Sequence, residues 1–161
     1  MNSLDAMDRP YERVYTVMDF YDGPRVGFAD FEGQPHAYRS VWRHELDDWD
    51  PDQRFELSPI TAELLALALE DWAIWRRWEE AFYAGETPQS EHPALPADRP
   101  RHEVLAPIIA QGLDIDLAAR RVAKGEFRAC NAVRRNATLI PTSRAELEVR
   151  WTLVEVTSPV V

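Results

Sequence analysis

The sequence predicts an α+β domain in which an antiparallel sheet packs against a long tryptophan-rich helix and one or two shorter helices. Three apolar segments separated by glycine-containing turns open the chain, and a long segment with helical periodicity follows them. An alternating strand pattern returns near the end of the chain. Residues 1–161 are expected to form a single domain, because one domain has typically ~100–200 residues.

An antiparallel meander is expected near the start of the chain. Its strands are predicted over residues 11–20, 25–31 and 35–43, which are rich in aromatic and β-branched residues. Asp-Gly and Glu-Gly turns separate the three segments. Gly27 interrupts the second strand and predicts a bulge or a close contact there.

The segments after the meander differ sharply in character. Residues 44–53 are too acidic for a buried element and predict a loop, whereas residues 54–57 predict a short strand at a sheet edge. The clearest element is a helix over residues 59–84. Ser58 is a preferred N-cap, Pro59 suits the first helical position, and Gly85 stands where a left-handed cap is expected.

The remaining elements are shorter. A proline-rich connector over residues 86–100 leads to a second helix over about 99–111, for which Asp98 is the expected cap. A short helix is predicted over 116–124, followed by strands over 126–132 and 145–157. The last strand is expected to join the sheet of the meander.

Composition excludes several classes of protein. Apolar residues make up 45% and charged residues 29% of the chain, which is ordinary for a globular protein and not for a disordered one. The single cysteine, Cys130, cannot form an internal disulfide. No apolar run reaches the ~18 residues of a membrane span, and no leader pattern opens the chain, so we expect a cytoplasmic protein without membrane contact.

The charge is strongly negative and unevenly distributed. The formal net charge is −10, and the acidic groups concentrate in residues 1–100. Residues 120–135 form a basic stretch that we expect to pair with the acidic body, within the chain or across a homodimer. Nucleic-acid binding through this stretch is a second alternative function, disfavoured because the chain as a whole repels phosphate.

Two carboxylates break the pattern of the long helix. At 100° per residue, Asp71 and Glu79 fall on the same face as Trp72, Trp75 and Trp78. A carboxylate among indole rings loses solvation and needs hydrogen-bond donors. One interpretation is structural, with the two carboxylates bonded to indole N–H groups or to arginines of the sheet, for which Arg25 and Arg39 are the obvious candidates.

The other interpretation is a site in an aromatic pocket. Its candidate catalytic residues are Asp71, Glu79 and His36, and its candidate ligand-binding residues are Arg25, Arg39, Trp72, Trp75 and Trp78. No cofactor or metal is expected. Residues 48–59 begin like a calcium loop but lack the glycine and the glutamate that such a loop requires at its sixth and twelfth positions.

The first function that these features predict is a small acidic, non-enzymatic protein that binds a basic protein partner, as an inhibitor or immunity protein does. Trp49, flanked by Asp48 and Asp50, is the expected anchor, because tryptophan is enriched at interface hot spots. The alternative is a small enzyme or ligand binder that uses the aromatic pocket.

Overall fold

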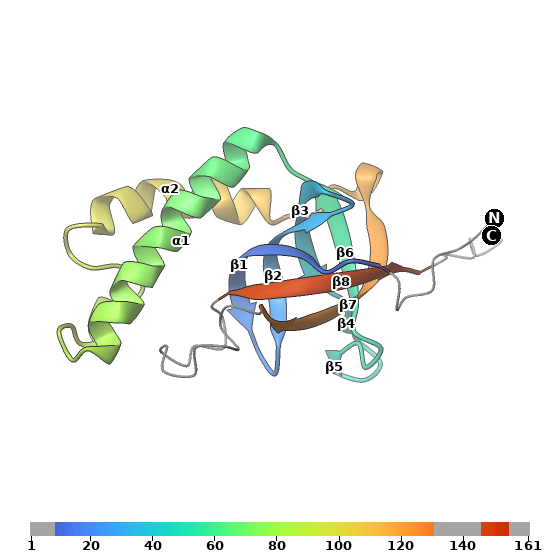
Figure 1. Cartoon of the computed structure of the whole chain (residues 1–161), viewed down its shortest axis with the longest axis horizontal. Coiled ribbons are helices and arrows are strands. Elements are labelled where there is room, and N and C mark those ends of the chain that lie inside the picture. Colours follow the sequence, from blue (N-terminus) through green and yellow to red (C-terminus); the bar gives the residue numbers. More distant parts are fainter. Residues whose placement is uncertain (1–8, 131–145, 155–161) are drawn as a thin grey trace.

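The computed structural model describes residues 9–130 and 146–154, and within them six strands close into an antiparallel barrel (Figure 1). Around the barrel the strands follow chain order: β1 (Glu12–Phe20), β2 (Pro24–Phe31), β3 (Gln34–Ser40), β6 (Arg54–Pro59), β7 (Arg121–Ala129) and β8 (Leu147–Leu153). A hairpin of β4 (Trp42–Arg43) and β5 (Asp48–Trp49) interrupts the series as a separate two-stranded sheet.

The predicted open sheet is therefore wrong. Alternation of apolar and polar residues is the same in an open sheet and in a barrel, so the pattern does not encode closure. Closure depends here on β8 returning to β1, where Glu12 pairs with Val149 and Arg13 with Glu148. These partners come from opposite ends of the chain, and no local signal links them.

The prediction of an edge strand and that of a short helix fail for a related reason. Residues 54–57 were expected at an edge, but β6 pairs with β3 on one side and with β7 on the other. The short helix predicted over 116–124 is replaced by the 3-10 helix η3 (Leu117–Ala119) and by most of the first half of β7. Alanine, arginine and lysine favour a helix locally, but pairing with both neighbouring strands overrides that preference.

The long helix is present, but its predicted start is wrong. α1 spans Ala62–Tyr83, and the hydroxyl of its N-cap residue Thr61 accepts a hydrogen bond from the backbone N–H of Leu64 at 3.1 Å. Ser58 and Pro59 instead end strand β6. Gly85 has a φ of 74°, which confirms the expected left-handed residue after the helix.

The second helix returns alongside the first. α2 spans Arg99–Gly112, close to its prediction, and the connector before it contains the 3-10 helix η2 (Gln89–Glu91). Asp98 precedes α2, but its side chain accepts from Arg77 of α1 at 2.8 Å rather than capping its own helix. Within the part of the chain that is described, no helix is long and apolar enough to cross a membrane.

Both helices lie on one side of the barrel, and strand β2 separates two cores (Figure 1). Ala29 and Phe31 of β2 face the barrel interior, whereas Phe28 packs in the layer beneath the helices. Gly27 lets β2 approach its neighbours closely, because a Cβ atom there would lie 2.2 Å from the backbone oxygen of Thr16. The expected close contact at Gly27 is thus confirmed.

Candidate functional site

The two helical carboxylates are buried, as the helical periodicity predicts. Asp71 is only 6% exposed and Glu79 only 5%. Asp71 Oδ1 lies 2.7 Å from Nδ1 of His102, on the first turn of α2. Glu79 Oε1 accepts from Arg76 at 2.9 Å, one turn earlier on the same helix.

The expected sheet arginines are not the partners of these carboxylates. Arg25 is buried and donates to the backbone oxygen of Tyr21 at 2.7 Å, and Arg39 pairs with Asp114 at 3.9 Å. The structural interpretation was therefore wrong about Arg25 and Arg39, although Glu79 does bind an arginine, Arg76. Both partners come from helices: Arg76 from α1 itself and His102 from α2.

His36 lies elsewhere as well. Its Nδ1 is 2.8 Å from the backbone oxygen of Gln34, and its ring packs edge-on against Phe31 at the β2–β3 turn. Thus the structure does not bring His36, Arg25 or Arg39 to the buried carboxylates. Of the candidate catalytic residues, Asp71 lines the smaller of the two cavities described below, whereas His36 and Glu79 line neither of them.

The three helical tryptophans divide into two groups. The rings of Trp72 and Trp75 lie 4.7 Å apart and line a cavity. Trp78 is only 5% exposed and instead stacks on Phe82, with His92 against its ring at 4.6 Å. The indole N–H of Trp78 has no hydrogen-bond acceptor within the described part of the molecule.

The cavity beside Trp72 and Trp75 measures about 150 Å³ and lies between β1, α1 and the start of α2. Its polar lining consists of Asp71, His92 and His102. The other lining residues are Val17, Met18, Trp72, Trp75 and Pro93. A carboxylate facing an imidazole in apolar surroundings makes this cavity the candidate site.

The contact with Asp71 determines what His102 offers. A carboxylate oxygen accepts, so Nδ1 carries the shared hydrogen and Nε2 of a neutral ring keeps its lone pair. Nε2 forms no hydrogen bond to any described residue, and the His102 side chain is 20% exposed. His102 therefore presents an oriented acceptor at the cavity.

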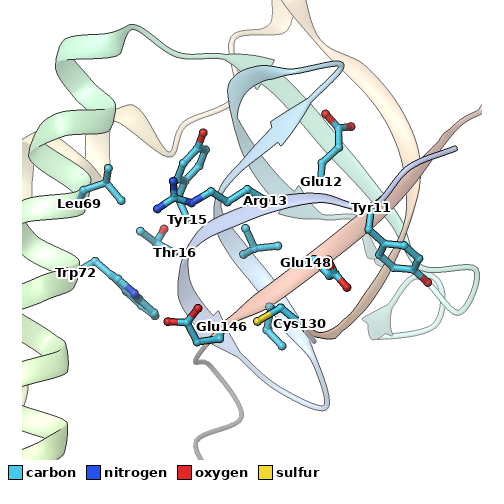
Figure 2. Close-up of a pocket in the computed structure, with 12 residues that line it drawn as sticks. Tyr11, Glu12, Arg13, Tyr15, Thr16, Leu69, Trp72, Cys130, Glu146 and Glu148 are labelled. Atoms are coloured by element: carbon cyan, nitrogen blue, oxygen red, sulfur yellow. The ribbon is translucent and has the colours of Figure 1, made fainter. Parts of the chain in front are cut away.

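A larger cavity of about 430 Å³ lies on the barrel side of Trp72, as Figure 2 shows. Trp72 and Leu69 reach it from α1, Thr16 belongs to β1, and Glu146 lies between Trp72 and Cys130 in the view of Figure 2. Its volume suits a small molecule, but its polar groups are largely hydrogen-bonded to other parts of the protein already.

Two carboxylates that line this larger cavity already accept such hydrogen bonds. Glu12 accepts the backbone N–H groups of Glu32 and Gly33 at 3.1 and 2.7 Å. Glu148 accepts from Arg128 at 2.7 Å. These carboxylates hold a turn and a strand pair in place, and we therefore give priority to the smaller cavity.

The predicted partner anchor lies on the β4–β5 hairpin. Trp42 and Trp49 meet edge to face with ring centroids 5.0 Å apart, and Trp42 is 40% exposed. Arg25 covers the Trp49 ring at 5.2 Å, and Asp48 is exposed beside it. This aromatic pair with its acidic neighbour forms a compact surface feature.

Asp50 does not belong to that surface. It is 1% exposed, and its carboxylate accepts from Arg54 at 2.8 Å and from Arg43 at 3.1 Å. The hydrogen bond from Arg54 is the main reason that the pKa of Asp50 lies below its ordinary value. Its observed role is to tie the hairpin to β6.

Three arginines in the described part of the basic stretch, Arg120, Arg121 and Arg128, are paired with acidic residues of the chain. Arg120 lies 3.7 Å from Glu56, and Arg121 lies 3.8 Å from Glu32. Residues 131–135 of the stretch lie outside the described residues. Nucleic-acid binding gains no support from the described arginines, whose charges are already opposed within the chain.

The residues that the sequence left unrecognised are His102, His92 and Met18. A signal for His102 was present in the charge pattern. Two ion pairs, Arg77–Asp98 and Glu70–Arg101, join α1 to the start of α2, where His102 lies.

Among the residues described, no cluster of histidine, cysteine and acidic side chains could hold a metal ion. Comparison of the chain with protein-family models, curated proteins and solved structures finds no match.

Proposed function

We propose that this protein binds a small organic molecule in the cavity between β1, α1 and α2, with His102 as its hydrogen-bonding anchor. The observation that carries the proposal is the 2.7 Å contact between Asp71 and His102 beside an apolar cavity. Burying a carboxylate and an imidazole carries a desolvation penalty, and apolar residues at the same positions would not carry it. A role in recognition accounts for a polar pair at this position.

The lining favours binding over catalysis. An Asp–His pair can act as a general base, but it then needs a nucleophile or an activated water within reach. No serine, threonine or cysteine lines this cavity among the described residues. The ring nitrogen of His102 is thus available to hold a ligand group in place.

A comparison of the two buried helical carboxylates tests this proposal. We would titrate phenol, imidazole, cyclohexanol and 1-butanol into the protein and follow the indole N–H signals of Trp72 and Trp75 by NMR. At least one compound should shift these signals, and His102→Gln should weaken its binding about tenfold. Glu79→Gln, which alters a buried carboxylate away from the cavity, should leave binding unchanged.

The outcomes are distinct. If none of the four compounds shifts the Trp72 or Trp75 signals, the cavity is not a ligand site. Equal losses of binding in His102→Gln and Glu79→Gln would show that both changes act through stability. Melting temperatures of the variants separate that case from a direct effect.

A second candidate function is binding of a basic protein segment at the β4–β5 hairpin. Its specific support is the exposed Trp42 ring, packed against the partly buried Trp49 beside Asp48, in a chain with a net charge of −10. Charge complementarity favours a basic partner and makes the association sensitive to salt. The expected homodimer also stays a prediction, to be checked by light scattering.

The hairpin surface is tested with an arginine-rich peptide as probe. Wild-type protein should bind it, and Trp42→Ala should weaken binding at least about tenfold. Tyr83→Ala removes another exposed aromatic side chain, 55% against 40% exposed for Trp42, from the end of α1 and serves as the matched control. Binding that ignores both salt and Trp42→Ala would argue against this surface.

A further inference from the structure

We infer that the ligand of the Asp71–His102 cavity is a single aromatic ring that carries a hydroxyl group, a compound of the phenol class. This inference rests on the proposed function and narrows it to one chemistry. It is built from the size of the cavity, the nature of its walls and the Nε2 acceptor of His102.

The size of the cavity limits the ligand to one ring. The volume is about 150 Å³, and a protein cavity of roughly that size holds a benzene molecule. A fused two-ring compound exceeds this volume, and its second ring would remain at the exposed side of the cavity near Met18. The larger cavity behind Trp72 is lined separately, with Trp72 as the one residue common to both.

The walls favour a flat aromatic group. Trp72 and Trp75 present indole rings, Val17 is 1% exposed at the cavity floor, and Pro93 adds a further apolar surface. The thioether of Met18 is able to contact a ring edge favourably. Aromatic rings packed on one another are stabilised beyond the burial of their area, and a saturated ring lacks this contribution.

The polar lining selects for a neutral hydrogen-bond donor. Nε2 of His102 is an acceptor without a partner among the described residues, so a ligand O–H group satisfies it directly. None of the described residues that line the cavity is an arginine or lysine, and the Asp71 carboxylate repels an anion. A phenolic hydroxyl supplies the donor without a full charge that the apolar walls would desolvate.

The exposed lining residues show how such a ligand enters. Met18 is 37% exposed, and His92 lies at the surface beside it in the cavity lining. Asp71 and Val17 form the buried end. A phenol entering past Met18 therefore places its ring against the paired indole rings of Trp72 and Trp75, with its hydroxyl toward His102.

The test is a titration of the full chain with matched ring compounds, followed by calorimetry and by the Trp72 and Trp75 indole signals. Phenol should bind about tenfold more tightly than toluene or anisole, because neither of these can donate to Nε2. Benzoate, benzylamine and 2-naphthol should bind more weakly than phenol. His102→Phe keeps a ring at this position but should reduce the affinity for phenol to that for toluene.

Two further variants keep the result interpretable. Met18→Trp fills the opening from a partly exposed position and should block phenol without disturbing Asp71. Leu69→Ala changes the larger cavity alone and should leave phenol binding as it is in the wild type. These controls remain informative if His102→Phe folds poorly.

Each contrary result has a definite meaning. Toluene and anisole binding as tightly as phenol would overturn hydroxyl recognition and leave the proposed ligand site intact. Tightest binding of benzylamine, benzoate or 2-naphthol would replace the phenol class by another. If no ring compound binds, or if Met18→Trp leaves phenol binding unchanged, the inference fails for this cavity.

Discussion

The barrel interior and the layer under the helices both bury aromatic side chains, but they treat them differently. Inside the barrel, four rings lie with their centroids 5.5–6.1 Å apart, from Tyr38, Phe55, Phe127 and Trp151. Trp151 donates to the backbone oxygen of Asp30 at 2.9 Å, and the Tyr38 hydroxyl donates to that of Thr16 at 2.8 Å. This interior is filled, and these polar atoms are satisfied.

The helical layer lacks both properties. It contains cavities on two sides of Trp72, a buried indole N–H on Trp78 without an acceptor among the described residues, and the carboxylate of Asp71. Imperfect packing of this kind costs stability and provides space for a ligand. The contrast indicates that the barrel supplies the stability and that the helical layer supplies the site.

The largest expected effect comes from removing one tryptophan from each region. Trp151→Ala should lower the free energy of unfolding by about 3–5 kcal/mol, because it opens a cavity in a closely packed core. Trp72→Ala should cost only about 1 kcal/mol, since its ring already borders empty space on two sides. Chemical denaturation of both variants measures the difference, and equal losses would remove the distinction between the regions.

A pair of glycines sharpens the same comparison. A Cβ atom at Gly27 would lie 2.2 Å from the backbone oxygen of Thr16, so Gly27→Ala should cost up to about 3 kcal/mol. At Gly112, at the end of α2, the nearest atom is a side-chain methyl of Leu64 at 2.4 Å. That methyl can move, and Gly112→Ala should change stability by less than about 1 kcal/mol. A larger loss at Gly112 would show that the helical layer is as rigid as the barrel wall.

The same contrast explains how much of the fold could be predicted. The meander strands and the second helix follow from periodicity and turn residues, which act over a few neighbouring residues. Barrel closure depends on the β1–β8 pairing, and β7 depends on partners in β6 and β8. The helix start failed because Thr61 is as good a cap as Ser58, and the pairing of Pro59 with His36 decides between them.

Only the part of the site on α1 was predictable from the sequence. Periodicity identified Asp71, Trp72 and Trp75 as inward-facing residues, and the structure confirms that Asp71 is buried. The other half depends on how α2 packs against α1, which places His102 opposite Asp71 across 31 positions of sequence. No periodicity within one helix contains that information. Whether these residues bind a ligand stays a prediction.

The buried carboxylate of the hairpin extends the comparison to electrostatics. Asp50→Asn should cost about 2 kcal/mol, because Arg54 and Arg43 lose a charged acceptor that is 1% exposed. The pKa of Asp50 is lowered in the folded state, so its stabilisation is present above the ordinary pKa and is lost as the pH falls through the lower folded value. Urea unfolding should therefore show a steeper loss below about pH 4 in the wild type than in Asp50→Asn. Parallel pH profiles would contradict the assignment.

The smallest effect is expected at the corresponding carboxylate of the helical layer. Asp98 accepts from Arg77 at 2.8 Å, which lowers the pKa of Asp98 in the folded state, but the arginine side chain is 52% exposed. Water and salt screen such a pair, so Asp98→Asn should cost only about 0.2–1 kcal/mol and less at high ionic strength. Since the folded pKa is lowered, this contribution also exists above the ordinary pKa and disappears on acidification below about pH 4. Urea unfolding at two salt concentrations measures the loss in the free energy of unfolding. If Asp98→Asn lost as much stability as Asp50→Asn, and equally at both salt concentrations, the ion pair between the helices would be as strong as the buried pair of the hairpin.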